Sequence, residues 1–387
     1  FERDTFPENW AGTQNNLGNA YGDRIHGDRA ENIERSIAAY ELALQVHTRE
    51  AFPENWARTQ NNLGNAYSVR IRGDRAENIE QAIAAYELAL QIYTRDAYPE
   101  DWARSTQNLG TAYRDRIYAE PTANLQAAID RYQQVAQIFT REAFPLSWAE
   151  NQGNLAAALM KRAALTETPQ DLDQAIALLQ DALQVSAPGS PDFIDSQYRL
   201  GTALSRRFEH SQASSDLQQA LAAYKTALNT INSEHYNRAK IWQALPTTQS
   251  ILGSRLVREG EWQQGLQLLI NSVRLLRDGD DDDAYANALY QTGRAHEILP
   301  DWDNARLYYR DALRLYIHLQ DQSGMAKSRH GLGSVLASQG YFQKGMVELE
   351  QARDLYQQLS WPERVAEVEQ VYRAAQRAEQ QIQEVTV

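Results

Sequence analysis

Asparagine residues recur at a fixed interval in the first half of the chain. They stand 46 residues apart, at Asn16, Asn62, Asn108 and Asn154. A carboxamide offers both a hydrogen-bond donor and an acceptor, so a row of them can bind successive peptide units of an extended ligand without reading its side chains. The pattern predicts a binding surface rather than a catalytic centre. The alternative is a polar, solvated face that was repeated because the whole segment was copied.

Further polar residues share this stripe if the segments are helical. Two more asparagines follow the ladder by three residues, two arginines precede it by four, and two cations lie further along. The predicted partner-binding residues are therefore Asn16, Asn19, Arg58, Asn62, Asn65, Arg104, Asn108, Asn154, Lys161 and Arg206. Acidic residues make the same surface mixed in charge rather than strongly cationic, namely Asp23, Asp115, Glu150 and Asp195.

No motif for catalysis or cofactor binding occurs in the sequence. A Gly-x-x-x-x-Gly-Lys phosphate loop, a His-Glu-x-x-His zinc helix and a Gly-x-Ser-x-Gly nucleophile elbow are all missing. The lack of cysteine excludes a disulfide framework and thiolate zinc sites. We expect no enzyme activity, no cofactor and no metal. His47 and His296 stand where other repeats have tyrosine, which favours packing over ligation.

The charge distribution narrows the class of partner. A net charge of −13 disfavours nucleic acid and anionic membranes, and no apolar run is long enough to span a bilayer. Together with the absence of cysteine, this favours a cytoplasmic location. The one acidic run, Asp278 to Asp283, lacks the spacing of a helix-loop-helix calcium site. It predicts a solvated loop whose last aspartates begin the next helix.

The residues described above belong to an internal repeat. The segment Phe6-Pro7-Glu8-Asn9-Trp10-Ala11 returns, with substitutions, at positions 52, 98 and 144, and residues 6–51 and 52–97 are identical at 37 of 46 positions. Each unit predicts two helices. The first begins at Pro7 and runs to about Ile25, and the second begins after Asp28, which has N-cap spacing to Glu31, and runs to about Thr48.

Apolar periodicity indicates how these helices pack. On the first helix one side gathers Trp10, Leu17, Tyr21 and Ile25. On the second helix a wider stripe, typical of a mostly buried helix, contains Ile33, Ile37, Tyr40 and Leu44. The recurring tryptophans are expected to pack between repeats rather than to stack a ligand; they stand at Trp10, Trp56, Trp102 and Trp148.

The pattern Leu-Gly-x-x-Tyr on one helix and Ala-x-x-x-Tyr-x-x-Ala on the next resembles the tetratricopeptide repeat family. Small residues at the helix crossing can be followed along the chain as the pairs Gly18/Ser36, Gly64/Ala82, Gly110/Ala128, Ala156/Ala175, Gly201/Ala220, Gly253/Gly265, Gly293/Ala305 and Gly333/Gly345. The resemblance implies an all-α, right-handed solenoid of about eight helix-turn-helix repeats. The apolar residues of 361–387 predict a C-terminal capping helix.

The resemblance also bears on the ligand. In this family the first helices line the concave groove, and the asparagine ladder is similar to that of peptide-binding members such as the O-GlcNAc transferase superhelix and kinesin light chains. Members that clamp a C-terminal carboxylate have a lysine two residues before the conserved glycine position. Here that neighbourhood carries amides such as Asn15, Asn61 and Gln107, so a carboxylate clamp is not expected.

Spacing within the pairs predicts two sub-arrays. The small residues are 18 or 19 apart in the first five pairs and 12 apart in the last three. The predicted organisation is therefore a long-repeat array over 1–231, a shorter-repeat array over 232–360 and the capping helix over 361–387. The junction is placed near 232–246, where Leu245-Pro246 predicts a helix break.

Residues 1–5 align with residues 47–51, the tail of a second helix, so the chain is expected to be a fragment that begins within a repeat. The near-identical units resemble arrays attached, in bacteria, to CHAT proteases or STAND signalling ATPases. This implies a protein- or peptide-binding sensor within a larger signalling or defence protein, with an effector domain upstream. The alternative is a passive scaffold or oligomerisation spacer without a groove ligand.

Overall fold

The structure, a computed structural model, describes residues 2–231 and 235–385. Every regular element in these residues is an α-helix, which confirms the predicted all-α class. The chain divides into two compact units, residues 1–210 and 211–387. This division follows packing, whereas the predicted arrays 1–231 and 232–360 follow repeat length, so the latter remain predictions. Residues 232–234 of the predicted junction, and residues 386–387 of the predicted cap, lie outside the described residues.

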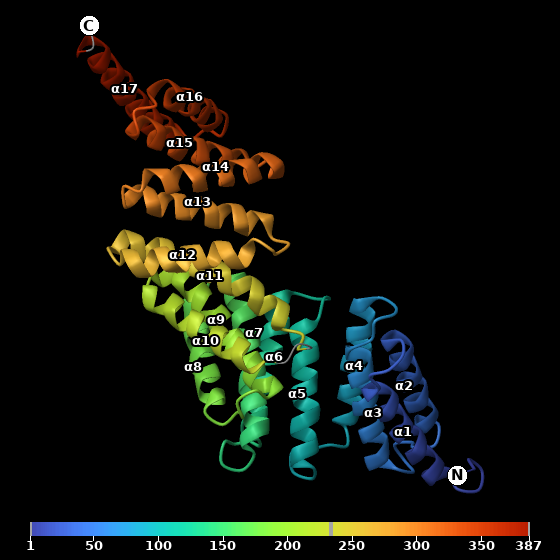
Figure 1. The fold of residues 1–387 in the computed structure, drawn as a ribbon. Helices are drawn as coiled ribbons and strands as arrows, with labels where there is room; N and C mark the ends of the chain where they lie inside the picture. The colour runs from blue at the N-terminus through green and yellow to red at the C-terminus, as the bar shows by residue number, and fades with distance from the viewer. Residues whose placement is uncertain (1, 232–234, 386–387) are drawn as a thin grey trace. The chain divides into compact units, whose positions relative to one another are not determined.

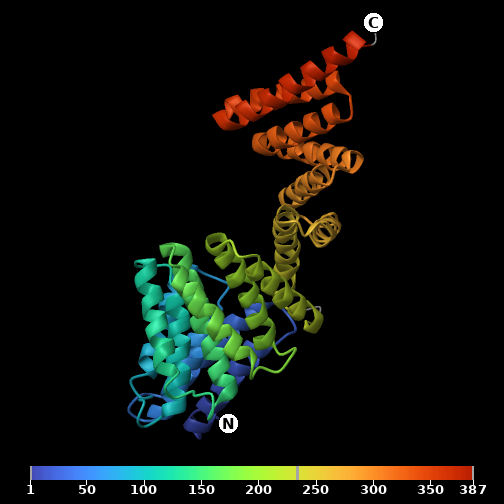
Figure 2. The ribbon, with the colours of Figure 1, turned by 90° about the vertical axis from the view of Figure 1, so that its left-hand side faces the viewer.

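The first unit is built of antiparallel helix pairs that lie side by side (Figure 2). In the first four pairs an odd-numbered first helix packs against the even-numbered second helix that follows it, and α2, α4 and α6 each pack on the next first helix. The helices are α1 (Pro7–Asp23), α2 (Arg29–Leu44), α3 (Pro53–Ser68), α4 (Arg75–Ala89), α5 (Pro99–Asp115), α6 (Pro121–Val135), α7 (Pro145–Thr166), α8 (Pro169–Leu183) and α9 (Pro191–Ser211), which ends at the boundary.

The second unit repeats this scheme with shorter connections (Figure 1, yellow to red). After α10, the pairs α11 with α12, α13 with α14 and α15 with α16 stack in order, and α17 follows. The helices are α10 (Ser214–Thr230), α11 (Arg238–Glu259), α12 (Trp262–Leu276), α13 (Asp282–Ile298), α14 (Trp302–Leu319), α15 (Gln322–Ser338), α16 (Phe342–Gln358) and α17 (Pro362–Val385). Gly201 and Ala220, the predicted fifth pair, stand in α9 and α10, on either side of the boundary.

The helices of the first unit begin where the sequence predicts. Proline opens α1, α3, α5 and α7, because its fixed φ suits a first helical turn and its missing N–H needs no partner there. The Asp28 carboxylate accepts a hydrogen bond from the Glu31 N–H at 2.8 Å and confirms the predicted N-cap. The α2 helix ends at Leu44, earlier than predicted, because the N–H groups of Val46 and His47 both donate to the Ala43 carbonyl and tighten the turn.

The connection between paired helices requires one left-handed residue. It is Gly27 (φ 89°) in the first pair and Gly73 (φ 80°) in the second, where glycine adopts this conformation without a Cβ clash. The third pair places Ala119 (φ 67°) at the equivalent point, so an L-residue carries the unfavourable geometry there. The same turn is therefore imposed by the packing of the helix pair as well as by the residue type.

Small residues allow close approach at the helix crossing. A Cβ added to Gly64 would lie 2.7 Å from the Tyr86 ring, and one added to Gly253 would lie 2.7 Å from the carbonyl oxygen of Gly265. In the first pair the Ser36 hydroxyl donates to the Gly18 carbonyl at 2.8 Å. These contacts confirm that small residues recur at the crossing because the paired helices approach each other closely there.

Neighbouring pairs are joined by an apolar core and by ion pairs. Leu63 of α3 packs against Ile33, Ile37 and Tyr40 of α2. At the edge of this core, Arg70 binds Glu34 with two hydrogen bonds of 2.8 and 2.7 Å, and one repeat later Arg116 binds Glu80 at 2.7 and 2.8 Å. Each arginine therefore links the second helix of one repeat to the end of the first helix of the next.

The apolar face predicted for the first helix is wrong in α1. Leu17 is 41% exposed and Ile25 is 92% exposed, whereas the buried residues of α1 are Ala11, Asn15 and Gly18. The equivalent Leu63 and Leu109 are buried because a second helix of the previous repeat covers them. In the described residues no such helix precedes α1, and Ile25 lies beyond the end of the helix.

The helix break predicted at Leu245-Pro246 is also wrong, because Pro246 lies inside α11, which continues from Arg238 to Glu259. A proline here removes one backbone hydrogen bond. Packing outweighs this cost: Ile241, Leu245 and Leu252 are buried around it, and the Ser272 hydroxyl of α12 donates to the Pro246 carbonyl at 2.7 Å.

The predicted capping helix is confirmed by α17. Its residues Val368 and Ala375 are buried, and Val365, Val371 and Tyr372 pack against the same core as Leu349 and Tyr356 of α16. Beyond Ala375 the helix carries mainly glutamine and glutamate. A polar outer face of this kind ends the stack of apolar surfaces.

The crossing contacts lead to a stability prediction. We expect Gly253→Ala to lower the free energy of unfolding by about 1–3 kcal/mol, because the added methyl group meets the Gly265 backbone, which cannot move without separating α11 and α12. Denaturant unfolding followed by circular dichroism measures this change. The control is Gly12→Ala in α1, where an added Cβ has no neighbour within 4 Å and helix propensity favours alanine. Equal effects of both variants would contradict the explanation.

Candidate ligand-binding face

The first helices of the first unit form a continuous polar surface, here called the first-helix face. It consists of α1, α3, α5, α7 and α9, of which the first four contact one another in sequence order. The asparagine ladder crosses this face as a chain of hydrogen bonds between neighbouring helices. Asn62 Nδ2 donates to Asn15 Oδ1 at 3.2 Å, and Asn108 Nδ2 donates to Asn65 Oδ1 at 3.0 Å. Part of the ladder therefore joins the repeats to one another.

Five of the predicted binding residues line one cavity of about 370 Å³, here called the ladder cavity. They are Arg58, Asn62 and Asn65 from α3 and Arg104 and Asn108 from α5. Its remaining lining is also largely polar and comes from α3, α5, α7 and the preceding loops: Asn61, Tyr93, Asp101, Ser105, Gln107, Phe139, Ser147 and Glu150. Carboxamides and guanidinium groups thus face one space large enough for several atoms of a ligand.

The other predicted residues lie in separate places on the same face. Asn19 lines a second cavity of about 330 Å³ together with Asn62 and Asn65. Asn154 lines a smaller cavity of about 190 Å³ between α7 and α9. Lys161 and Arg206 line another, of about 320 Å³, and Asn16 is exposed and lines none of the four cavities named here. The predicted residues therefore lie along a row of cavities rather than in one pocket.

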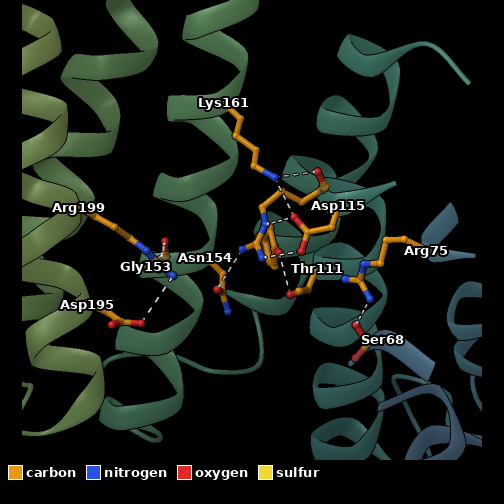
Figure 3. Close-up of polar contacts among 11 residues, drawn as sticks. Ser68, Arg75, Thr111, Asp115, Gly153, Asn154, Lys161, Asp195 and Arg199 are labelled. Atoms are coloured by element: carbon orange, nitrogen blue, oxygen red, sulfur yellow. Dashed lines mark hydrogen bonds and ion pairs between the residues drawn. The ribbon is translucent and has the colours of Figure 1, made fainter. Parts of the chain in front are cut away.

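An ion-pair cluster stands in the middle of this row (Figure 3). Asp115 accepts from Lys161 Nζ at 2.8 Å and from Arg114 Nε and Nη2 at 3.2 and 3.1 Å. Burial raises the pKa of Asp115, but the hydrogen bonds and charges of Arg114 and Lys161 outweigh it and lower the pKa to about 2. The cluster is therefore ionised at neutral pH and fixes the α5–α7 contact.

Several residues of the ladder cavity were missed by the sequence prediction of binding residues. Gln107 Nε2 donates to Glu150 Oε1 at 2.8 Å, and Ser105 Oγ donates to Asn61 Oδ1 at 3.0 Å. Burial and the nearby Asp192 raise the pKa of Glu150. The signal for Asn61 and Gln107 was present, because they adjoin the ladder at the same interval, but nothing in the sequence indicated that Ser105 faces it.

The tryptophans and histidines have packing roles, as predicted. Trp102 packs against the core of two successive repeats. An arginine seven residues earlier in the chain stacks over the ring of each of the four recurring tryptophans, as Arg95 does over Trp102 at 5.9 Å. His47 is fully buried, and its ring meets Phe52 edge-on. Burial lowers the pKa of His47. His296 stacks on Tyr308 and hydrogen-bonds to Asp301 at 3.0 Å.

The acidic run has the predicted structural role. Asp281 caps α13 by accepting from the Ala284 N–H at 2.9 Å, and Asp282 and Asp283 form its first turn. In the part of the chain that the structure describes, no group of three or more His, Asp or Glu side chains is arranged to hold a metal ion. None of the described helices has both the length and the apolar character needed to cross a membrane.

Comparison with known proteins agrees with the repeat geometry. The profile of the tetratricopeptide repeat family matches residues 56–94 and 194–236. The human tetratricopeptide repeat protein 29 is 23% identical over 121 residues, which are 30% of this chain and 26% of that protein. The match therefore spans about a quarter of the length of this relative.

Two solved structures share the fold. The C-terminal part of a tetratricopeptide repeat-containing protein from Cytophaga hutchinsonii is 11% identical, with a TM-score of 0.51 over 79% of this chain and 95% of that one. The apo form of RapI is 12% identical, with a TM-score of 0.51 over 96% and 98%. The profile match therefore indicates tetratricopeptide repeats at residues 56–94 and 194–236, and the two structures show that the chain shares their helical repeat fold. Repeats of this family generally serve as non-catalytic protein-interaction modules.

The Asp115 cluster leads to a prediction about pH. We expect Asp115→Asn to lower the free energy of unfolding at neutral pH by on the order of 1–2 kcal/mol. The carboxylate with a lowered pKa stabilises the fold above about pH 4, and this contribution disappears as the pH falls toward 2. Denaturant unfolding at a series of pH values measures the difference.

Lys161→Gln serves as the paired control for this prediction. It removes one of the two cations that favour the ionised carboxylate and leaves Arg114 in place, so it should show a smaller loss at neutral pH and the same convergence with the parent in acid. A difference from the parent that stays constant between pH 7 and pH 3 would contradict the role of the Asp115 charge.

Proposed function

We propose that the first-helix face binds an extended segment of a protein partner, with the ladder cavity as its central subsite. The observation that carries the proposal is the gathering of Arg58, Asn62, Asn65, Arg104 and Asn108 around one open space. A carboxamide has two N–H donors and a carbonyl acceptor, so the ladder bonds between helices leave groups available to a peptide backbone. Such binding reads the shape and polarity of the backbone more than its sequence.

The geometry of the ladder favours a segment that crosses several repeats. Asn62 and Asn65 line both the ladder cavity and the neighbouring cavity with Asn19, so one ligand can pass from α5 toward α1 without leaving the amide surface. Charges of both signs lie along this path, since Arg104 and Glu150 line the same cavity. A ligand of mixed charge suits the surface better than a polyanion.

The wider role that we propose is recognition within a larger signalling or defence protein, in which binding is relayed to an effector domain upstream. This part rests on the resemblance of the near-identical repeats to arrays attached to such effectors. Small rotations at stacked interfaces add along a solenoid, which gives a route from an occupied face to a distant domain. The second candidate, a scaffold that only separates or joins other domains, needs no ligand in the ladder cavity.

The experiment compares the parent chain with the double variant Asn62→Ala/Asn108→Ala in affinity capture from cell extract, with bound proteins identified by mass spectrometry. We expect the double variant to lose a partner that the parent retains, with at least a roughly tenfold weaker affinity for the purified partner. The loss follows from removing two carboxamides that line the same cavity.

The matched control is Asn16→Ala, which makes the same chemical change on an exposed residue outside the cavities named above. It should retain the partner. Circular dichroism of each variant shows whether the helices remain, because the two alanines also remove the bond to Asn15 and the bonds to Asn61 and Asn65. Identical captures by the folded parent and double variant, or no capture, would favour the scaffold.

A further inference from the structure

A separate cavity at the other end of the first helices differs in character from the ladder cavity. It has a volume of about 320 Å³ and is lined by four cationic side chains, Arg114, Arg116, Lys161 and Arg206. The rest of its described lining is uncharged: Pro121, Asn124, Leu125, Ala164 and Leu165. We call it the cationic pocket. An excess of positive charge is unexpected in a chain whose net charge is −13.

The sequence explains where this charge comes from. Lys161 and Arg206 occupy the same repeat position, five residues after the small residue of the first helix. The earlier repeats have Asp23, Val69 and Asp115 there. The charge at this position therefore changes sign between the third and fourth repeats, and copying of the unit does not account for the change.

The two cations adopt the same geometry. Lys161 Nζ lies 3.4 Å from the carbonyl oxygen of Arg114, and Arg206 Nη1 lies 3.3 Å from that of Met160, which is the equivalent residue one repeat later. Each side chain thus reaches back to the preceding first helix. Lys161 meets the Asp115 carboxylate there, but at the equivalent point Arg206 meets the backbone next to Lys161. Two positive charges are therefore held close together.

The carboxylates nearby neutralise only part of this charge. Glu80 binds Arg116 in a bidentate pair, and Asp115 is shared between Arg114 and Lys161. Among the described residues, the hydrogen bond of Arg206 goes to a carbonyl rather than to a carboxylate. Lys161 is 53% exposed, and Arg206 is exposed, so N–H groups of both remain open to an anion from outside.

The uncharged lining indicates which kind of molecule carries the anionic group. Leu165 is 55% exposed at the rim, and Leu125 is buried beneath it, which places aliphatic surface beside the cations. Free phosphate would leave this surface uncovered, and a nucleic acid needs a longer basic track than one pocket on an acidic chain. A carboxylate side chain next to an aliphatic one, as in an acidic protein segment, uses both features.

We propose that the cationic pocket is a second ligand site, which binds an acidic segment of a protein partner. Lys161 and Arg206 bind a carboxylate of this segment, and a neighbouring aliphatic side chain of the segment packs against Leu165. This inference does not rest on the asparagine ladder. The two sites lie on the same unit, share no lining residue, and select ligand groups of different chemistry.

The test uses a random-sequence peptide library displayed on phage and selected at low salt against the whole chain. The selected peptides should be enriched in Asp or Glu adjacent to Leu, Ile or Val. Arg206→Gln should abolish this enrichment and weaken a synthetic selected peptide about tenfold in fluorescence anisotropy. Arg206 is exposed, which makes Arg206→Gln a mild change for the fold, and circular dichroism checks it.

The matched control is Arg207→Gln, which removes the same charge one residue further on, where the side chain pairs with Asp173 and does not line the pocket. It should keep the enrichment, and so should Asn62→Ala/Asn108→Ala. Selected peptides without acidic enrichment, or equal selection by Arg206→Gln and the parent, would overturn the proposal. Loss of acidic peptides in the asparagine double variant alone would assign them to the ladder cavity and also overturn it.

Discussion

The close approach of paired helices at their small residues is the constraint on which the array depends. In the second pair the Tyr86 ring lies where any Cβ on Gly64 would stand, and in the later pair of α11 and α12 the two backbones nearly touch at Gly253 and Gly265. This spacing lets second helices such as α2, α4 and α6 bury their stripes against two first helices. The first helices then contact one another directly, and their outward residues form one surface.

The core and the candidate binding face are connected by the same tyrosines. The hydroxyl of Tyr40 donates to Asn19 Oδ1 at 2.7 Å, and that of Tyr86 donates to Asn65 Oδ1 at 2.8 Å. The rings of these tyrosines are buried, and their hydroxyl groups reach the first-helix face. In the third repeat Tyr132 lies 3.0 Å from the Thr111 hydroxyl instead. Burial raises the pKa of Tyr86, and the asparagine carbonyl satisfies its hydroxyl. Some asparagines of this face thus orient the core as well as lining the cavities.

Features that depend on motifs within one repeat or one helix could be predicted from the sequence, whereas features that depend on contacts with neighbouring helices could not. The helix pairs, the Asp28 cap and the cap formed by α17 follow from motifs within one repeat or one helix. The exposure of Leu17 depends on which helix covers it, and the continuity of α11 through Pro246 depends on contacts with α12. The division of the predicted binding residues among several cavities depends on the offsets between helices, which periodicity alone does not contain.

The ion pairs between repeats bear on how such an array can change in length. Glu34 with Arg70 and Glu80 with Arg116 make the same bond 46 residues apart, each between one repeat and the next. A recombination event that removes residues 52–97 in frame would bring Glu34 opposite Arg116 and restore the pair at the new junction. Gain or loss of whole units therefore leaves the interfaces matched, so copy number can drift without a compensating substitution. The fourth repeat, where Arg162 meets Gln126 and Asp171 instead, marks where that interchangeability ends.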